Sequence, residues 1–220
     1  MSATPSYNLK AVPLHSVKNL FVSHHAYGGS GSFGTYVFAV IESGNPIAAF
    51  IWNPPPPGAS RHVCPEAPHA VLALSRMVAV PKNQRKLKHI SKPLRRQMKH
   101  LIDRGRWPVL ITFSDEGLGH NGFVYQCSGW TPTHRRKAPQ YERGGARTST
   151  YANGKTTTSG LTKIGNSFIQ RWENWICAPG TVQEHMSDSG WIRIPIPGKV
   201  WKSGNQAYRW TNKGTQLDLI

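Results

Sequence analysis

Residues 70–80, AVLALSRMVAV, constrain the fold more than any other stretch of the chain. The run is almost continuously apolar, whereas a strand with one solvated face alternates apolar and polar residues. We therefore expect a strand that is buried on both faces, inside a sheet. Arg76 interrupts the run, and a buried charge is costly unless it is paired. Arg76 is thus either a salt-bridged structural residue or a charge at the mouth of a functional site.

The residues before this strand predict a helix and a hairpin. Residues 15–28 place apolar side chains at helical spacing and end at Gly28. Residues 35–57 contain two β-rich runs joined by Ser43-Gly44-Asn45, a turn signal, and prolines end the second run because proline cannot donate to a ladder.

The residues after this strand predict a second helix and another strand. The helix is expected from Ser91, its N-cap, to Gly105, which follows its end, and the strand over residues 107–113. This alternation predicts an α/β (α+β) fold with a mixed central sheet flanked by helices. Ligands bind such sheets where strands end, so we expect a site near Arg76, Ser91 and Asp115.

The composition changes after Thr131, toward Arg, Gly, Thr and Pro. Residues 148–158 contain Asn153-Gly154 and predict a hairpin. Residues 166–176 place apolar side chains along one helical face and predict a helix. We expect a catalytic core over residues 1–133 and a basic, β-rich accessory region over residues 134–220 that packs on it.

The charge balance predicts a polyanionic partner. The chain has 27 Lys and Arg against 10 Asp and Glu, a formal net charge of +17. Nucleic acid is the expected partner, against the alternatives that the charge serves solubility or membrane adhesion. Eight basic residues lie between Lys82 and Lys99, and a second group comprises Arg135, Arg136, Lys137, Arg143 and Arg147. Together they could flank a duplex, although each could equally be a solvated face.

The cysteines and the N-terminus indicate where the protein works. Cys64, Cys127 and Cys177 are far apart and form no C-x-x-C pair, which argues against a disulfide framework and favours a reducing cytoplasm. The N-terminus has no apolar signal core and no apolar run approaches 20 residues, so we expect no membrane span.

Residues 114–130, SDEGLGHNGFVYQCSGW, hold the candidate catalytic groups. Asp115 lies just past a strand end and Tyr125 follows ten residues later, a spacing that can place a base and an acid on either side of a transfer. The three intervening glycines allow sharp turns and close approach of a planar ligand. The structural alternative is that Asp115 caps the next helix and Tyr125 fills the core.

Histidines near this segment raise the question of a metal. His24 and His25 are adjacent, so on a helix their side chains diverge by about 100° and at most one faces a given site. With His120 and Tyr125 one of them could form a mononuclear iron site. The spacing matches no ligand signature, so we assign no metal, and a core or supporting histidine is the preferred interpretation.

Several motifs together resemble a known family. The succession of LSRMVAV (74–80), a basic loop, SKPL (91–94), a strand and residues 114–130 is similar to the GNAT acyltransferase superfamily. Combined with HHAYG (24–28), it resembles more closely the Mom DNA-modification proteins of Mu-like bacteriophages. The resemblance covers residues 15–133 well and is weak toward the C-terminus.

The resemblance implies a GNAT-like fold and an unusual reaction. Mom proteins attach a methylcarbamoyl group to the exocyclic nitrogen of adenine in double-stranded DNA, through a carbon chain and not as a simple acyl, which protects phage DNA from host restriction in the bacterial cytoplasm. The glycine-free segment 82–91 departs from the superfamily's glycine-containing pyrophosphate loop, which puts ordinary acetyl-coenzyme A binding in doubt. The donor therefore stays open, with acetyl-coenzyme A or a related acyl donor as candidates.

The resemblance also assigns site residues. Asp115 and Tyr125 match the catalytic pair, and Arg76 and Ser91 match residues near the donor site. To the donor site we add Val78 and Arg85, and to the catalytic set Arg76 and Ser91. For the DNA substrate we assign His24, Tyr27, His120, Arg135 and Arg136.

The substrate geometry and the rival functions complete the expectations. Chemistry on adenine N6 in a duplex requires the base to be flipped into a pocket, where Trp52, Trp107 or Trp130 could stack on it. One rival function is coenzyme-A-dependent N-acetylation of a protein or tRNA. The other is a basic DNA-binding protein without catalysis.

Overall fold

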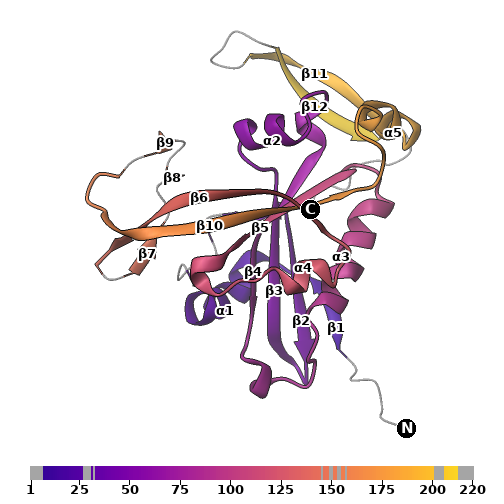
Figure 1. The fold of residues 1–220 in the computed structure, drawn as a ribbon. Helices are drawn as coiled ribbons and strands as arrows, with labels where there is room; N and C mark the ends of the chain where they lie inside the picture. The colour runs from indigo at the N-terminus through magenta and orange to yellow at the C-terminus, as the bar shows by residue number, and fades with distance from the viewer. Residues whose placement is uncertain are drawn as a thin grey trace.

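One large mixed sheet organises the molecule (Figure 1). The computed structural model describes residues 7–26, 31, 33–144, 146–148, 151–152, 155–156, 158–200 and 206–212. Eight strands form the sheet in the order β1-β2-β3-β4-β5-β10-β6-β7. Their bounds are Asn8–Ala11, Tyr36–Glu42, Asn45–Asn53, Val71–Ala79, Val109–Asp115, Thr162–Trp175, Thr131–Arg143 and Ala146–Thr148, in that order.

Helices cover both faces of this sheet. The α3 face is covered by α3 and α4, which pack on Phe50, Leu72 and Leu110. The α1 face is covered by α1, which packs on Ala49 and Ile51, and by α2. The helices are η1 Leu14–Val17, α1 Lys18–His24, α2 Pro57–Val63, η2 Pro68–Ala70, η3 Lys82–Gln84, α3 Ser91–Asp103, η4 Glu116–Leu118, α4 Phe123–Gln126 and α5 Val182–Asp188.

The first half follows the sequence expectations closely. The β2–β3 hairpin turns at Ser43 and Gly44, both with positive φ (50° and 83°), the left-handed pair that matches the twist of a hairpin. Residues 71–74 of β4 are buried on both faces, as the apolar run predicts, whereas Ser75 is exposed and Arg76 and Met77 are half-buried. The N-cap of α3 was predicted wrongly: Ile90 is the N-cap, and Ser91 begins the helix with its side chain making no capping bond.

A β-bulge in β4 decides which way Arg76 points. Ile51 pairs with Arg76 and Trp52 pairs with Leu74, so Ser75 is an extra residue. The Ser75 hydroxyl donates to the carbonyl of Ile51 at 2.9 Å and accepts from the Asn53 amide at 3.2 Å. Because side chains alternate between faces, the extra residue turns Arg76 onto the α1 face, whereas Leu74 packs on the α3 face.

The parallel strands β4 and β5 separate after a short pairing. Their register runs only from Val71↔Val109 to Ala73↔Ile111. Beyond that point the two strands diverge, and the Thr112 hydroxyl donates to the carbonyl of Leu74 at 3.1 Å at the start of the gap. The sheet therefore opens at the C-terminal ends of its two central strands, where ligands bind in α/β sheets.

The helix predicted over residues 166–176 is instead the strand β10. It pairs with β5 on one side and with β6 on the other, so tertiary pairing overrides the helical spacing. The aromatic and β-branched residues of this segment favour a strand, which the spacing argument left out. The sheet thus continues past residue 133, and β6 and β10 extend beyond its body as a long arm (Figure 1).

The remaining strands form two small hairpins. β8 Tyr151–Ala152 and β9 Lys155–Thr156 pair as the sequence predicts, and the turn residues between them lie outside the described residues. β11 Trp191–Val200 and β12 Gln206–Asn212 form a second hairpin at the end of the molecule that holds α2 and α5 (Figure 1). Within the described ranges, no helix has the length and apolarity needed to cross a membrane.

Candidate active site

A cavity of about 990 Å³ occupies the gap between β4 and β5. The bulged stretch 74–77 forms one wall and the end of β5, residues 112–115, forms the other. The segment 118–125 and part of the β6–β10 arm close it. Its polar lining includes His25, Arg76, Thr112, Asp115, His120, Asn121, Tyr125, Arg136, Gln140 and Tyr141.

Arg76 and His25 meet on the α1 face of the cavity. Nη1 of Arg76 lies 3.3 Å from Nδ1 of His25. Burial, followed by the charge of Arg76 and the neighbouring His120, lowers the pKa of His25 to about 4. His25 is therefore neutral at neutral pH, and its Nδ1 can accept the hydrogen bond from the guanidinium.

Asp115 lies on the same face at the end of β5 and is only 7% exposed. Its Oδ1 accepts from the backbone N–H of Gly117 at 3.0 Å and from the hydroxyl of Ser167 on β10. The first bond makes Asp115 the N-cap of η4, so the structural alternative raised from the sequence is realised. A carboxylate so fixed on the cavity wall also has a defined direction toward a ligand.

His120 follows on the same wall. The burial of its ring lowers its pKa, and the charge of Asp115 opposes that shift. His120 therefore favours its neutral form, as His25 does.

Tyr125 approaches the cavity from the α3 face. Its ring packs against Trp130 and Trp172, with ring centroids 6.1 and 5.9 Å away, and Trp172 donates to the Ser114 hydroxyl at 2.9 Å. Burial raises the pKa of the Tyr125 phenol, and a hydrogen bond with Thr112 opposes that shift. The phenol is therefore protonated at neutral pH, and Tyr125 and Asp115 line the same cavity.

Glycine is required where the chain passes from Asp115 to Tyr125. Gly119 and Gly122 have φ of 74° and 73°, the left-handed region that side chains disfavour. A Cβ on Gly122 would stand 1.9 Å from the Trp172 ring. The turn geometry therefore requires Gly119 and Gly122, and close packing against Trp172 also requires Gly122.

The structure brings half of the assigned residues together. Arg76, Asp115, His120, Tyr125 and Arg136 all line the cavity. His24 does not: it is exposed, and His25 takes the inward position because it lies one helical turn beyond the buried Phe21. Tyr27 lies outside the described residues.

The residues assigned to the donor lie away from the cavity, Arg76 excepted. Val78 is 4% exposed in the apolar core and Ser91 is 8% exposed. Arg85 folds inward, and its guanidinium donates to the carbonyls of Val80 and Leu87. The three side chains are used in packing and in pinning the loop, and the assignment of these residues to a donor site stays a prediction.

The loop before α3 already holds a carboxylate. Glu42 accepts from the backbone N–H groups of Lys86 and Leu87 at 2.7 and 2.8 Å. These contacts lower the pKa of Glu42 despite its desolvation. A diphosphate would have to displace Glu42 to reach the same two amides, so this loop does not fit a coenzyme A diphosphate as it stands.

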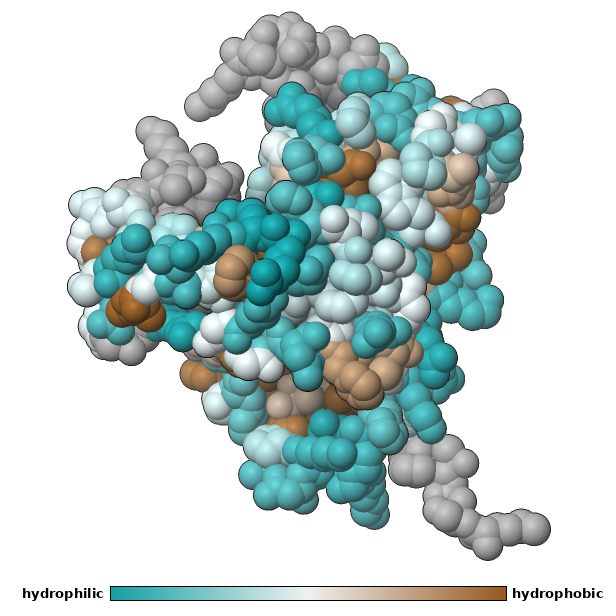
Figure 2. Space-filling model, in the orientation of Figure 1, coloured by the Kyte–Doolittle hydropathy of each residue, from teal (hydrophilic) through white to brown (hydrophobic). Residues whose placement is uncertain are grey.

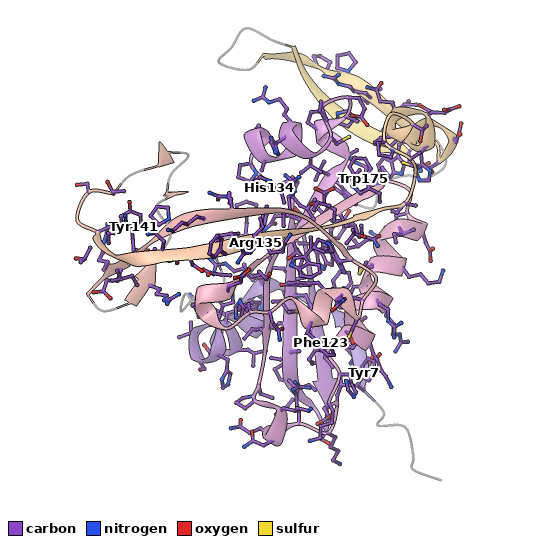
Figure 3. The ribbon with its side chains drawn as sticks, in the orientation of Figure 1. Tyr7, Phe123, His134, Arg135, Tyr141 and Trp175 are labelled. Atoms are coloured by element: carbon purple, nitrogen blue, oxygen red, sulfur yellow. The ribbon has the colours of Figure 1, made fainter. Side chains whose placement is uncertain are left out.

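The basic arm divides its charges between the two faces. Arg136 lines the cavity, whereas Arg135 does not. The Arg135 guanidinium donates two hydrogen bonds of 2.8 Å to the Glu116 carboxylate and lies 3.6 Å from the ring centroid of Phe168. Figure 3 shows His134 and Arg135 in the middle of the arm and Tyr141 toward its far end. Hydrophilic side chains dominate the arm in Figure 2.

Sequence reasoning missed the aromatic groups of the cavity. Trp52, Trp107 and Trp130 are all under 7% exposed and belong to the core. Phe113 and Phe123 line the cavity instead and are 44% and 61% exposed. The available sequence signal was the position of each Phe beside polar residues, Phe113 before Ser114-Asp115 and Phe123 after Asn121-Gly122. Among the described residues, no group of three His, Cys, Asp or Glu side chains could hold a metal.

Comparisons with known proteins agree with this architecture. The model of the Mom protein family matches residues 6–173. An N-acetyltransferase from Staphylococcus aureus Mu50 is 10% identical with a TM-score of 0.50, and the match covers 78% of this chain and 99% of that one. The ribosomal-protein-S18-alanine N-acetyltransferase of Escherichia coli is 14% identical with a TM-score of 0.48, covering 80% and 97%. No curated protein matches the chain. The expected GNAT-like fold is confirmed.

Proposed function

The chain belongs to the Mom protein family, and on that basis we propose that it is a transferase that converts adenine in phage DNA to N6-(methylcarbamoyl)adenine. Family membership and the acetyltransferase fold support DNA modification and group transfer. The observation on which the proposal rests is the cavity that gathers Arg76, Asp115 and Tyr125 in one gap of the sheet.

Asp115 is the proposed base. The lone pair of adenine N6 is delocalised into the ring, so the amine is a poor nucleophile until its proton is removed during attack. A positioned carboxylate contributes about 10²- to 10⁴-fold to such a step. Ser167 and Gly117 fix Asp115, which supports this role because an aligned base needs no reorganisation.

Tyr125 is the proposed acid on the other side of the reacting group. As N6 attacks the donor carbon through which the methylcarbamoyl group becomes attached, which is not a simple acyl carbon, the N6–C bond forms and the bond from that carbon to the leaving group breaks. The N6 proton passes to Asp115, and the leaving group takes a proton from a phenol that burial keeps protonated. The approach of the two groups from opposite faces suits this order.

Arg76 is the proposed clamp for the donor's carbonyl oxygen. Its bond with neutral His25 fixes the guanidinium without neutralising its charge. The fixed cation would hold that oxygen and so orient the donor carbon for attack by N6. The carrier of the donor group stays undefined, since the loop before α3 does not fit a coenzyme A diphosphate unless Glu42 moves.

The cavity is large enough for the acceptor. Its volume, about 990 Å³, is at the upper end of the range for small-molecule sites, about 300–1,000 Å³. Adenine N6 lies inside the paired stack of a duplex, so the base would enter flipped. Phe113 offers an exposed aromatic ring on the α1 face, where the basic arm begins. Modified adenine would then protect the phage genome from host restriction in the bacterial cytoplasm.

Expression in bacteria tests the proposal. DNA from cells making the protein is digested to nucleosides, and mass spectrometry is used to look for deoxyadenosine heavier by one methylcarbamoyl group. We expect Asp115→Asn, Arg76→Ala and Tyr125→Phe to abolish or sharply reduce this nucleoside. Glu116→Gln is the matched control, because this neighbouring carboxylate pairs with Arg135 outside the cavity.

Two outcomes would replace the proposal. Unmodified nucleosides together with tight DNA binding would indicate a non-catalytic DNA-binding protein. Transfer of a labelled acetyl group from acetyl-coenzyme A to protein or tRNA, without DNA, would indicate an N-acetyltransferase. Full modification by Asp115→Asn would overturn the assignment of the base alone.

A further inference from the structure

A second cavity, of about 710 Å³, lies at the other end of β4. It is enclosed by α2, η2, α5 and β11, and it shares no lining residue with the cavity between β4 and β5. Its lining includes Arg61, His69, Gln183, Trp191 and Arg193. The proposed reaction uses none of these residues.

The charge of this second cavity is positive. Arg61 comes from α2 and Arg193 from β11, and both side chains are exposed. Arg106 lies behind them and donates to the carbonyl of His69 at 2.9 Å. Glu66 is the lining carboxylate, and it accepts from the backbone N–H of Gly180 at 3.0 Å.

The lowered pKa of His69 agrees with this positive charge. Burial lowers its pKa to about 4, and the charges of Arg106 and Arg193 push it in the same direction. The ring is therefore neutral at neutral pH and adds no charge of its own. Among the described lining residues there are two guanidinium groups, Arg61 and Arg193, and one carboxylate, Glu66, so the cavity favours an anion.

Trp191 adds a fixed aromatic wall. Its indole N–H donates to the carbonyl of Arg104 at 2.7 Å, and the Arg106 guanidinium lies 5.8 Å from its ring centroid. A free inorganic anion would fill only a small part of a volume of about 710 Å³ and would gain nothing from packing on the indole ring. A phosphate attached to a sugar would fill more of this volume and would pack its sugar on the ring.

The second cavity lies on the same side of the sheet as the reactive groups. α2 covers the α1 face, and its His62 contacts His134 of β6 with ring centroids 5.9 Å apart. Arg136, two residues further along β6, lines the cavity between β4 and β5. Seven residues of chain separate His69 from Arg76, so the two lie at most about 23 Å apart, the length of a fully extended chain. That limit corresponds to at most about 7 base pairs at about 3.4 Å each.

We propose that the cavity between α2 and β11 binds the phosphate–sugar backbone of the duplex that presents the reactive base. Arg61 and Arg193 contact backbone phosphate, and Trp191 contacts the attached sugar. This inference rests on the proposed function, because it takes DNA as the substrate. It extends that function by giving the duplex a direction, from the reactive cavity past His134 to α2.

Salt-dependent DNA binding tests the proposal. Fluorescence anisotropy is measured with a duplex of about 20 base pairs that has its target adenine at the centre and so reaches past the required 7. We expect Arg61→Ala and Arg193→Ala each to raise Kd and to reduce the slope of log K against log salt by about 0.9. The double variant should reduce it by about 1.8. Lys10→Ala on β1 removes the same charge at the far edge of the sheet and should leave the slope unchanged.

Duplex length separates this site from general electrostatics. A duplex of about 8 base pairs with a central adenine extends only about 4 on either side and falls short of the second cavity. Arg61→Ala and Arg193→Ala should therefore bind it like the wild type. The proposal would be overturned if the two variants bound both duplexes more weakly than the wild type by the same factor. It would also be overturned if they bound neither duplex more weakly.

Two further outcomes are distinguishable. If the wild type modifies DNA but both arginine variants match Lys10→Ala, this inference fails and the proposed function stands. If the wild type neither binds nor modifies DNA, the proposed function itself fails.

Discussion

Replacing Gly122 by alanine should damage the site through packing, and its cost can be worked out. Gly122 has φ of 73°, so any L side chain there costs about 1–2 kcal/mol. Its new Cβ would also stand 1.9 Å from one atom and 2.5 Å from another of the Trp172 ring. Overpacking of this kind costs about 1–3 kcal/mol more, because the ring must move. The total destabilisation is about 2–5 kcal/mol.

Gly129→Ala is the matched control. Gly129 has φ of 85°, but a Cβ there would meet nothing within 4 Å. The control therefore suffers the backbone cost of about 1–2 kcal/mol without the clash. For a chain of this size each kcal/mol lowers Tm by about 2–4 °C, so thermal unfolding separates the two variants.

The same displacement should reach the chemistry. Trp172 packs on Tyr125 and holds Ser114, so a moved indole disturbs the proposed acid. We expect Gly122→Ala to lose adenine modification even below its lowered Tm, while Gly129→Ala keeps it. Equal Tm values for the two variants would refute the packing argument. Normal modification by Gly122→Ala would refute the coupling to Tyr125.

Three further predictions concern the site and its surroundings. Ser167→Ala removes a donor to the buried Asp115 carboxylate and should cost about 1.5–3 kcal/mol in urea unfolding, against no change for the exposed Ser23→Ala. Glu42→Ala frees the two loop amides, so hydrogen exchange at the backbone N–H of residues 86 and 87 should accelerate, and unchanged rates would contradict the contact. His25 and His69 have pKa values of about 4 in the folded protein, against 6.5 in the unfolded chain. As pH drops from 6.5 toward 4, the unfolded state therefore binds protons that the folded state does not. The free energy of unfolding should fall over this range. Unfolding in urea across that range checks this, and a His25→Gln variant with the wild-type slope would refute the contribution of His25.

Local patterns predicted much of the fold because their causes are local. The apolar run of residues 70–80 specifies a central strand, and Ser43-Gly44 specifies the hairpin turn through positive φ. The same reasoning failed at residues 166–176, where helical spacing coexisted with strand-forming residues. Pairing with β5 and β6 decided that segment, and neither partner is near it in sequence.

The candidate site was predictable in its residue types and less so in its geometry. Asp115, Tyr125 and Arg76 were identified from a motif and from a charge in an apolar run, both visible along the chain. The choice between His24 and His25 depended on how α1 packs through Phe21, which sequence spacing left open. The exposure of Phe113 in the cavity likewise depends on where β4 and β5 part.

The sequence by itself indicated most strands and helices of the first half, although not α2, together with the excess of positive charge and the chemical groups available at the end of β5. Only the tertiary structure decided that one extra residue, Ser75, turns Arg76 onto the face where Asp115 lies. It also decided that Glu42 occupies the amides of the loop before α3. Both outcomes depend on contacts between residues more than 20 positions apart, and local propensity carries no information about such contacts.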